Sequence, residues 1–259
     1  MRRALSQHWP EYAIEAAGLG LFMVSAGLFA VLLYHPASPA LDAIADPLGR
    51  RVLMGLAMGS TAIALIYSPW GQRSGAHFNP AVTLTFLRLG KVERWDAVFY
   101  AMAQALGGVG GIVLVNTLTG GLVAHPAVRY VATVPGPWGR SVAFAAEVAI
   151  SFALMSVVLA VSNTARLSRF TGLCAGVLVA TWITVEAPLS GMSMNPARSL
   201  ASSVPANLWT AFWIYLTAPP LGMLLAAELH VRLGRLPVRC AKLDHAGGQR
   251  CIFRCGYAT

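Results

Sequence analysis

The chain has 259 residues, of which 56% are hydrophobic and only 11% are charged, and its mean hydropathy is +0.62. An apolar share of this size excludes a disordered or fibrous chain and exceeds that of ordinary soluble domains, so lipid is the expected solvent. The net charge of +9 could indicate a nucleic-acid binder, but the basic residues lie between apolar runs, which favours an explanation from membrane topology.

Six apolar runs are long enough to cross a bilayer as helices, since about 20 residues span a ~30 Å hydrocarbon core. They cover residues 12–34, 52–68, 97–123, 141–162, 172–189 and 208–229. The run at 52–68 lies at the short end of the usual range. The chain is therefore predicted to be an all-α membrane protein with six transmembrane helices.

Two short segments, one after the second run and one after the fifth, are versions of each other. The first reads SGAHFNPAV and the second reads GMSMNPARS. Their shared tripeptides are Asn79-Pro80-Ala81 and Asn195-Pro196-Ala197. Asn can cap a helix, and Pro suits the first helical position because an N–H there would have no partner. The apolar stretches that follow hold only about ten residues, so each predicted helix crosses about half of the hydrocarbon core.

The two segments belong to two larger repeats of the chain. Glu15 lies in the first predicted span and Glu147 in the fourth, each in a setting rich in Gly and Ala. We place repeat 1 at about 10–123 and repeat 2 at about 139–233. Three spans per repeat is an odd number, so the second repeat enters the membrane inverted and the two re-entrant half-helices meet near the midplane. Such backbone is tolerated only in protein or beside a wet cavity, so a cavity is implied.

The basic residues predict the orientation. With both termini in the cytosol, 14 of the 19 Lys and Arg residues lie inside, and the outside holds only Arg50, Arg51, Arg129 and Arg140. An excess of Lys and Arg in cytoplasmic loops is the usual rule. We therefore expect an integral protein of the plasma (cell inner) membrane with cytosolic termini.

Both Asn-Pro-Ala boxes, Glu15, Glu147 and Gln104 in a Gly-rich third span together resemble the aquaporin and aquaglyceroporin family, or major intrinsic protein family. The resemblance covers about residues 10–233. It implies an aquaporin-like right-handed bundle of six helices and two half-helices, assembled as a homotetramer with one pore per protomer. Residues 1–233 are expected to form the channel domain, and residues 234–259 a basic cytosolic tail outside the resemblance.

Asn79 and Asn195 are the first candidates for pore chemistry. Each side-chain oxygen can accept from the free N–H groups of its half-helix while the NH₂ group donates into the pore. A passing water or alcohol then meets two donors at the midplane, where the positive ends of two helix dipoles oppose protons and cations, as in aquaporins generally. Helix capping alone would explain one box but explains two related boxes poorly.

Arg198 lies on the second half-helix, three residues after Asn195, where the first repeat carries Val82. A charge at membrane depth is costly and marks a functional site by default. The alternative is a structural ion pair with Glu186. By the resemblance, Arg198 is the arginine of the aromatic/arginine selectivity filter.

The other filter positions come from counting within the resemblance. Counting back from the second box gives Ile183 and Met192, and counting from the first box gives Met58, or Gly59 if the intervening loop holds no extra residue. This lining lacks the Phe and His of strict water channels and the aromatics of glycerol channels. The choice between water and glycerol therefore stays open at this point.

Three further residues are assigned structural roles. Glu15 and Glu147 are intramembrane carboxylates, and a proton relay through them would make the protein a transporter. The resemblance instead has them accept hydrogen bonds from the backbone of the re-entrant loops, which we favour because those loops need acceptors at that depth. His77 is interpreted as a packed loop residue, with a cytosolic pH gate as the alternative.

The tail concentrates three of the four cysteines of the chain. Cys240, His245, Cys251 and Cys255 fall within sixteen residues, a set that could hold Zn²⁺ tetrahedrally. The alternative is a disordered basic tail with reduced thiols, as expected in the cytosol. No other cofactor is expected.

The expected function is a passive channel for water and/or small uncharged solutes such as glycerol, excluding protons and ions. The alternatives are a proton-coupled secondary transporter that uses Glu15 and Glu147, and a structural or adhesive membrane protein with a closed pore. The sequence shows no nucleophile–base constellation or cofactor loop, so no enzyme is expected. The expected partners are the lipid bilayer, water and neutral solutes, without nucleic acid.

Overall fold

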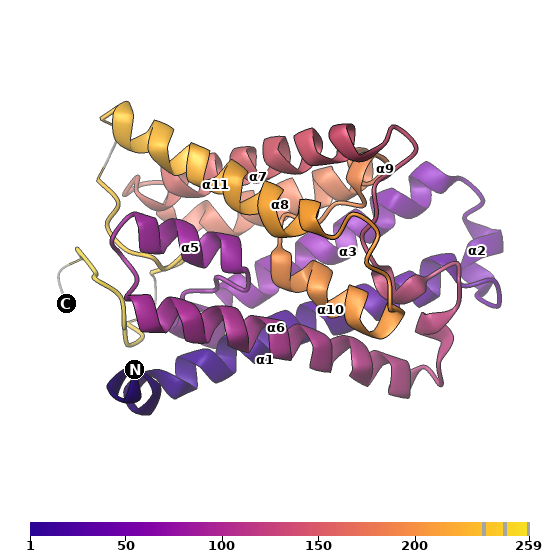
Figure 1. Cartoon of the computed structure of the whole chain (residues 1–259), viewed down its shortest axis with the longest axis horizontal. Coiled ribbons are helices and arrows are strands. Elements are labelled where there is room, and N and C mark those ends of the chain that lie inside the picture. Colours follow the sequence, from indigo (N-terminus) through magenta and orange to yellow (C-terminus); the bar gives the residue numbers. More distant parts are fainter. Residues whose placement is uncertain (235–236, 246–247, 258–259) are drawn as a thin grey trace.

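The computed structural model of the chain describes residues 1–234, 237–245 and 248–257, and these residues form helices and loops without a strand. Residues 235–236, 246–247 and 258–259 of the predicted tail lie outside the described residues. Six of the described helices are long and apolar enough to cross a membrane (Figure 1). These are α1 (Arg2–Tyr34), α3 (Pro47–Tyr67), α6 (Arg94–Leu118), α7 (Arg140–Ser162), the helix Ser168–Val185 that contains α8 (Thr171–Val185), and α11 (Trp213–Arg232). The predicted all-α fold with six spans is confirmed.

Two short helices begin at the Asn-Pro-Ala boxes. They are α5 (Pro80–Arg88) and α10 (Pro196–Ala206). The Asn79 side chain accepts from Ala81 N, and the Asn195 side chain accepts from the N–H groups of Ala197 and Arg198. In Figure 1, α5 lies toward the end of the bundle that carries both termini, whereas α10 lies toward the opposite end. The two half-helices therefore approach the middle of the bundle from opposite sides.

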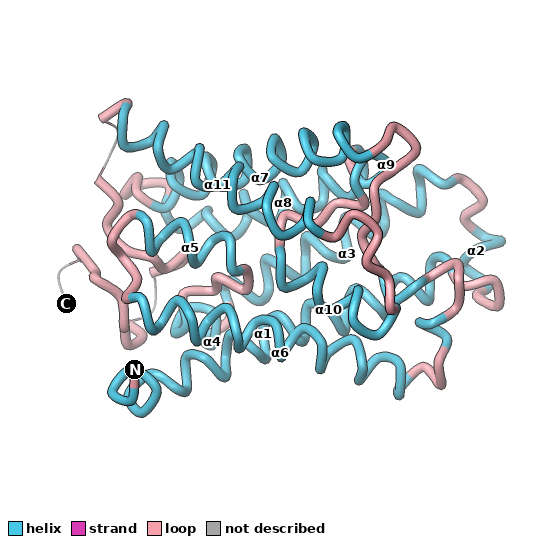
Figure 2. Tube along the Cα trace, viewed as in Figure 1, coloured by secondary structure: helices cyan, strands magenta, loops and turns pink. Residues whose placement is uncertain are grey.

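The remaining helices are short connections. They are α2 (Pro39–Ala43), α4 (Pro69–Ser74), η1 (Leu122–Ala124), η2 (Arg129–Val131), η3 (Ser168–Phe170) and α9 (Ala187–Ser190). Helices α4 and α9 each precede a loop that runs inside the bundle and leads into a half-helix (Figure 2).

Some helix ends differ from the predicted runs. Helix α1 begins ten residues before the run at 12–34, because the polar residues ahead of the run continue the helix. The run at 172–189 is divided into α8, which ends at Val185, and α9, which begins at Ala187 with Pro188 in its first turn. The last span begins at Trp213 rather than 208, after a turn in which Ala211 adopts a φ of +50°. Hydropathy predicts which residues lie at the depth of the lipid, but the helix ends depend on turn residues, which a hydropathy pattern does not identify.

Small residues allow the spans to pack closely. A Cβ on Gly107 of α6 would lie 2.0 Å from the Ala16 carbonyl oxygen of α1, and a Cβ on Gly222 of α11 would lie 2.3 Å from the Val148 oxygen of α7. Small residues at such crossings are typical of membrane helices, where apolar burial alone does not drive association. The pairs α1/α6 and α7/α11 hold the same places in the two predicted repeats, so the packing follows the repeat.

Candidate channel and its selectivity filter

The loops before the two half-helices have the same backbone conformation. Each passes through one Gly and two other residues with positive φ, a region that non-Gly residues rarely adopt. The values are +94°, +55° and +45° at Gly75, Ala76 and Phe78, and +84°, +50° and +53° at Gly191, Met192 and Met194. Strained backbone of this kind persists only where the surroundings fix it. Two buried carboxylates supply part of those surroundings.

Glu15 is fully buried beside the first loop and accepts four hydrogen bonds. The backbone N–H groups of His77 and Phe78 donate to its two oxygens at 3.1 Å and 2.6 Å. The Ser74 hydroxyl donates at 2.7 Å, and Gln104 Nε2 donates at 2.7 Å. The carboxylate therefore collects donors from the loop and from α6.

Glu147 of α7 makes the equivalent contacts with the second loop. The N–H groups of Ser193 and Met194 donate to its oxygens at 2.7 Å and 2.8 Å, and the Ser190 hydroxyl donates at 2.8 Å. The positions of these three donors match those of Ser74, His77 and Phe78, counted from the Asn of each box.

Each loop also receives a hydrogen bond from one tyrosine, a contact that the sequence did not predict. Tyr100 OH donates to the Ser74 carbonyl oxygen at 2.7 Å, and Tyr215 OH donates to the Ser190 carbonyl oxygen. Tyr100 follows Asn79 by 21 residues and Tyr215 follows Asn195 by 20. That near-equal spacing is the signal from which the pair could have been found.

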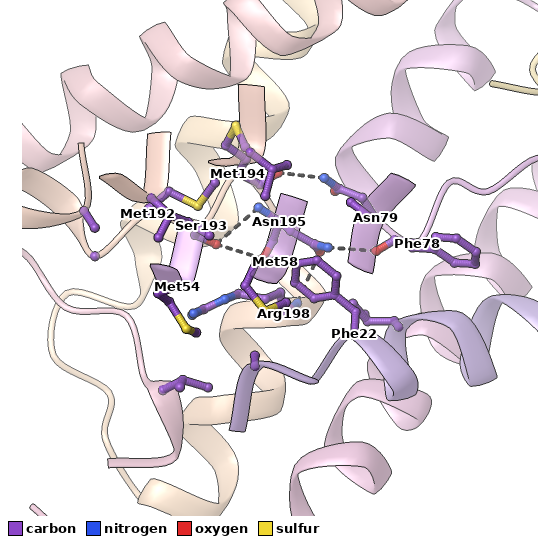
Figure 3. A pocket seen from close by; sticks show the side chains of 18 of the residues that line it. Phe22, Met54, Met58, Phe78, Asn79, Met192, Ser193, Met194, Asn195 and Arg198 are labelled. Atoms are coloured by element: carbon purple, nitrogen blue, oxygen red, sulfur yellow. Dashed lines mark hydrogen bonds between the residues drawn. The ribbon is translucent and has the colours of Figure 1, made fainter. Parts of the chain in front are cut away.

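The two Asn side chains link the half-helices to each other. Asn79 Nδ2 donates to the Met194 carbonyl oxygen, and Asn195 Nδ2 donates to the Phe78 carbonyl oxygen, both at 2.7 Å (Figure 3). An amide NH₂ has two N–H donors, so each Asn keeps one for another partner. The expectation that the whole NH₂ group donates into the pore needs correction, because half of its capacity joins the two loops.

A single cavity of about 530 Å³ passes these side chains. Both Asn residues line it, and so do seven residues of α3 from Pro47 to Ile66. At about 1.5 Å per residue, that stretch of helix follows about 28 Å, close to the ~30 Å thickness of a hydrocarbon core. The cavity therefore runs along the bundle for about the depth of a membrane.

The four residues predicted for the selectivity filter all line this cavity. They are Met58, Ile183, Met192 and Arg198. Gly59, the alternative to Met58, is not among the lining residues, and a Cβ there would lie 2.5 Å from the Gly176 carbonyl oxygen of α8. The structure thus points Met58 into the cavity and packs Gly59 between helices.

Arg198 brings a charged group to a mostly apolar wall. Among the described residues it forms no ion pair with Glu186, and its Nη1 is buried without a hydrogen-bond partner. Val82, its counterpart in the first repeat, also lines the cavity. Arg198 therefore lines the path with a charged side chain, one nitrogen of which has no hydrogen-bond partner in the protein.

Other lining residues were not predicted from the sequence. Phe22 of α1 and Met54 of α3, both labelled in Figure 3, line the cavity, and so does Leu243 of the tail. Phe22 and Met54 carry no motif, so only the packing of the helices reveals them.

His77 uses both of its ring nitrogens in contacts within the protein. Nδ1 lies 3.0 Å from Thr83 Oγ1, and Nε2 lies 2.8 Å from the Ala241 carbonyl oxygen of the tail. The ring is buried and stacks between Phe86 and Phe253. His77 therefore connects the first loop to the tail.

Comparisons with known proteins agree with this architecture. The chain is 36% identical to Aquaporin NIP6-1 of Arabidopsis thaliana over 209 residues, which are 80% of this chain and 65% of the relative. It is 34% identical to Glycerol uptake facilitator protein-like 6 of Lactiplantibacillus plantarum over 182 residues, which are 69% of this chain and 83% of the relative. The chain thus spans just under two thirds of the plant relative.

A solved structure has the same fold. The aquaglyceroporin from Plasmodium falciparum superposes with a TM-score of 0.71 and 22% identity, covering 86% of this chain and 96% of that one. A family model described as Major intrinsic protein matches residues 7–230. Members of that family are channels rather than enzymes, in agreement with the expectation from the sequence. The chain belongs to the major intrinsic protein family.

Proposed function

We propose that this protein is a passive channel for water and small uncharged solutes such as glycerol that excludes protons and ions. The observation that carries the proposal is the cavity that follows α3 for about the depth of a membrane and passes both Asn79 and Asn195. The names of the relatives, which include aquaporins and a glycerol uptake facilitator, support the same class of solutes.

The two Asn side chains supply the step that excludes protons. Each has one N–H in the contact between the loops and a second for a passing oxygen atom. A water that accepts from both residues cannot also accept a proton from the next water in the row. The N-termini of α5 and α10 add positive potential at the same place, which opposes protons and other cations.

The filter favours solutes with both a hydroxyl group and an apolar face. Met58, Ile183 and Met192 give three apolar walls, and Arg198 gives a donor without a protein partner. A polyol can direct its oxygen atoms to the guanidinium group and its carbon atoms to the thioether and aliphatic groups. We therefore place glycerol-sized neutral solutes among the substrates beside water.

The alternative of a proton-coupled transporter has less support. Both oxygens of Glu15 and both oxygens of Glu147 accept hydrogen bonds from the loops. A carboxylate that is needed to hold strained backbone is poorly suited to repeated protonation. The same contacts support a structural role for both residues, and the contacts of His77 support a packing role.

We further propose that both termini face the cytosol, because that orientation places 14 of 19 basic residues inside. The membrane is then the plasma (cell inner) membrane, and the assembly is a homotetramer with one channel per chain. The outer surface of the six spans carries many exposed large apolar side chains, which fits contact with lipid and with neighbouring copies.

Reconstituted protein is expected to raise the water and glycerol permeability of proteoliposomes without raising their proton permeability. Stopped-flow light scattering measures shrinkage in an impermeant osmolyte and re-swelling in glycerol, and an entrapped pH dye measures protons. Empty vesicles and vesicles with heat-denatured protein are the controls. Water and glycerol permeability equal to that of empty vesicles would overturn the channel proposal.

Ile183→His is expected to lower glycerol permeability about tenfold relative to water permeability. The imidazole adds polar groups to the cavity that Arg198 also lines and removes one apolar wall, so the carbon face of a polyol loses its partner. The ratio of the two permeabilities in the same vesicles is the measurement, and Ile183→Leu is the matched control. An unchanged ratio would show that this residue does not contact the solute.

A further inference from the structure

The tail returns across the end of the bundle that carries both termini (Figure 1). Its described segments are 237–245 and 248–257. They bring together Cys240, His245, Cys251 and Cys255, whose candidate ligand atoms all lie within 4.8 Å of one another. Cys240 Sγ lies 3.5 Å from Cys251 Sγ, and His245 Nε2 lies 3.1 Å from Cys255 Sγ. No part of the channel chemistry uses these residues.

The arrangement has the size and chemistry of a structural zinc site. Zn–S bonds of about 2.3 Å and Zn–N bonds of about 2.0 Å place tetrahedral ligand atoms about 3.5–3.8 Å apart. The observed separations bracket that range, so a small movement of the side chains would complete the shell. Three thiolates and one imidazole are a ligand set typical of closed structural zinc sites.

The local charge also fits. Three thiolates around Zn²⁺ leave one net negative charge, and Lys242 lies near all three thiols. Its ammonium group is held by the carbonyl oxygens of Gln249 and Arg250, at 3.0 Å and 2.7 Å. A fixed positive charge at this place offsets the excess charge of the site.

We propose that Cys240, His245, Cys251 and Cys255 bind one Zn²⁺, and that this ion holds the tail across the channel entrance on the side of the termini. The tail has few groups of its own to fold around. Its buried apolar side chains are Ala241, Leu243 and Phe253 beside the cysteines. Segments of this size normally need a metal or disulfides to keep a fixed structure.

The zinc ligands alternate with the residues that contact the entrance. Next to Cys240, the Ala241 carbonyl oxygen accepts from His77, and the Leu243 N–H donates to the Gly75 carbonyl oxygen at 3.1 Å. Between Cys251 and Cys255, Phe253 stacks on His77 with ring centroids 5.3 Å apart.

An ion bound by both segments therefore joins two separate contacts with the first Asn-Pro-Ala loop. Because Leu243 also lines the cavity, the metal fixes part of the wall of the channel.

The tail is anchored at its edges by polar contacts with neighbouring helices. Arg239 N donates to Asn163 Oδ1 at 2.7 Å at the end of α7, and Arg254 pairs with Glu93 at 2.6 Å before α6. The exposed Arg254–Glu93 ion pair contributes little to stability. They set the place of the tail but leave its internal structure dependent on the proposed ion.

The metal content of the full-length protein tests the site. Protein purified under reducing conditions without chelator is expected to carry about one zinc per chain by mass spectrometry of the metal. Cys251→Ser and Cys240→Ser are expected to lose it, whereas Cys174→Ser is the matched control and keeps it, because Cys174 lies in α8. Metal-free wild type, or a Cys240–Cys251 disulfide in place of zinc, would overturn the proposal. The result does not depend on whether the channel conducts.

Limited trypsin digestion tests the second half of the proposal. Lys242 and Arg250 lie between the ligands, and both are expected to be protected while zinc is bound. A chelator should speed cleavage at these residues about tenfold or more in wild type and in Cys174→Ser, and added zinc should restore protection. In Cys251→Ser the cleavage should be fast with or without the chelator. Equal rates before and after chelation of wild type would refute the claim that the ion holds the tail.

Discussion

Glu15→Leu is expected to abolish the accumulation of folded protein in the membrane. The substitution leaves three buried donors without an acceptor, namely the N–H groups of His77 and Phe78 and the Ser74 hydroxyl, and it removes the closer of the two acceptors of Gln104 Nε2. Each buried donor without a partner costs about 1–3 kcal/mol. The total is comparable with the whole free energy of unfolding of a typical domain, about 5–15 kcal/mol.

The measurement is the yield of detergent-solubilised protein that elutes as a sharp peak in size exclusion, together with its thermal midpoint. Glu15→Gln keeps one acceptor oxygen and is expected to give an intermediate yield. Glu228→Leu is the matched control, since Glu228 is 36% exposed and pairs with Arg88 at the surface, where an ion pair contributes little. A Glu15→Leu protein as stable as the control would show that the first loop does not need this carboxylate.

Glu147→Leu is expected to have a similar effect, because Glu147 accepts from three donors of the second loop that correspond to Ser74, His77 and Phe78 of the first. Equal losses of folded protein in Glu15→Leu and Glu147→Leu would show that both repeats depend on a buried carboxylate that holds the re-entrant loop. A double variant adds little information, because each single substitution already removes the acceptor that holds the loop before one half-helix.

The sequence predicted the half-helices because their signals are local. Asn before Pro is read from two neighbouring residues, and the structure shows both Asn side chains capping the helices that follow. The paired carboxylates were found for a different reason. A charged residue in an apolar span is rare enough to stand out, so its counterpart in the other repeat can be recognised.

The lining of the cavity was only partly predictable. Arg198, Ile183 and Met192 follow from their distance to the second box, but Met58 and Gly59 differ by one residue and so by about 100° around a helix. Packing decides between them, because Gly59 is needed where α3 meets α8. Phe22 has no counterpart in any motif and lines the cavity only because α1 crosses at that depth.

The contacts of the tail could not be predicted from the sequence. Its cysteine spacing drew attention to a metal site, but nothing in the sequence indicated that the same residues lie against His77 and the first loop. Contacts between segments more than 150 residues apart depend on the whole bundle, and no local pattern reports them. The domain boundary expected at residue 233 therefore separates two parts that pack on each other.

Arg198→Val is expected to raise the permeability to protons and small cations while the protein still folds and conducts water. Val is the residue that the first repeat carries at this place, so the half-helix can accept it. The backbone N–H of residue 198 can still donate to the capping oxygen of Asn195 after the substitution. Arg198 Nη1 has no hydrogen-bond partner in the protein, so its loss leaves no acceptor of that atom unpaired.

The size of the effect follows from the charge. A unit charge about 4 Å from a passing cation costs about 1–4 kcal/mol, depending on how wet the cavity is. Every 1.4 kcal/mol is about a factor of ten, so cation and proton flux should rise about fivefold or more. The dipoles of α5 and α10 remain, and they should keep the variant well below the flux of an open pore.

Proton flux is measured with an entrapped pH dye under an imposed gradient, and water flux is measured in the same vesicles. Arg140→Val removes the same charge from an exposed site at the start of α7 and is the matched control. A raised proton flux in Arg198→Val alone assigns the exclusion to this side chain. A variant that fails to fold would make Arg198 a structural residue. A folded variant with unchanged proton and cation flux would leave exclusion to the two Asn residues and the helix dipoles.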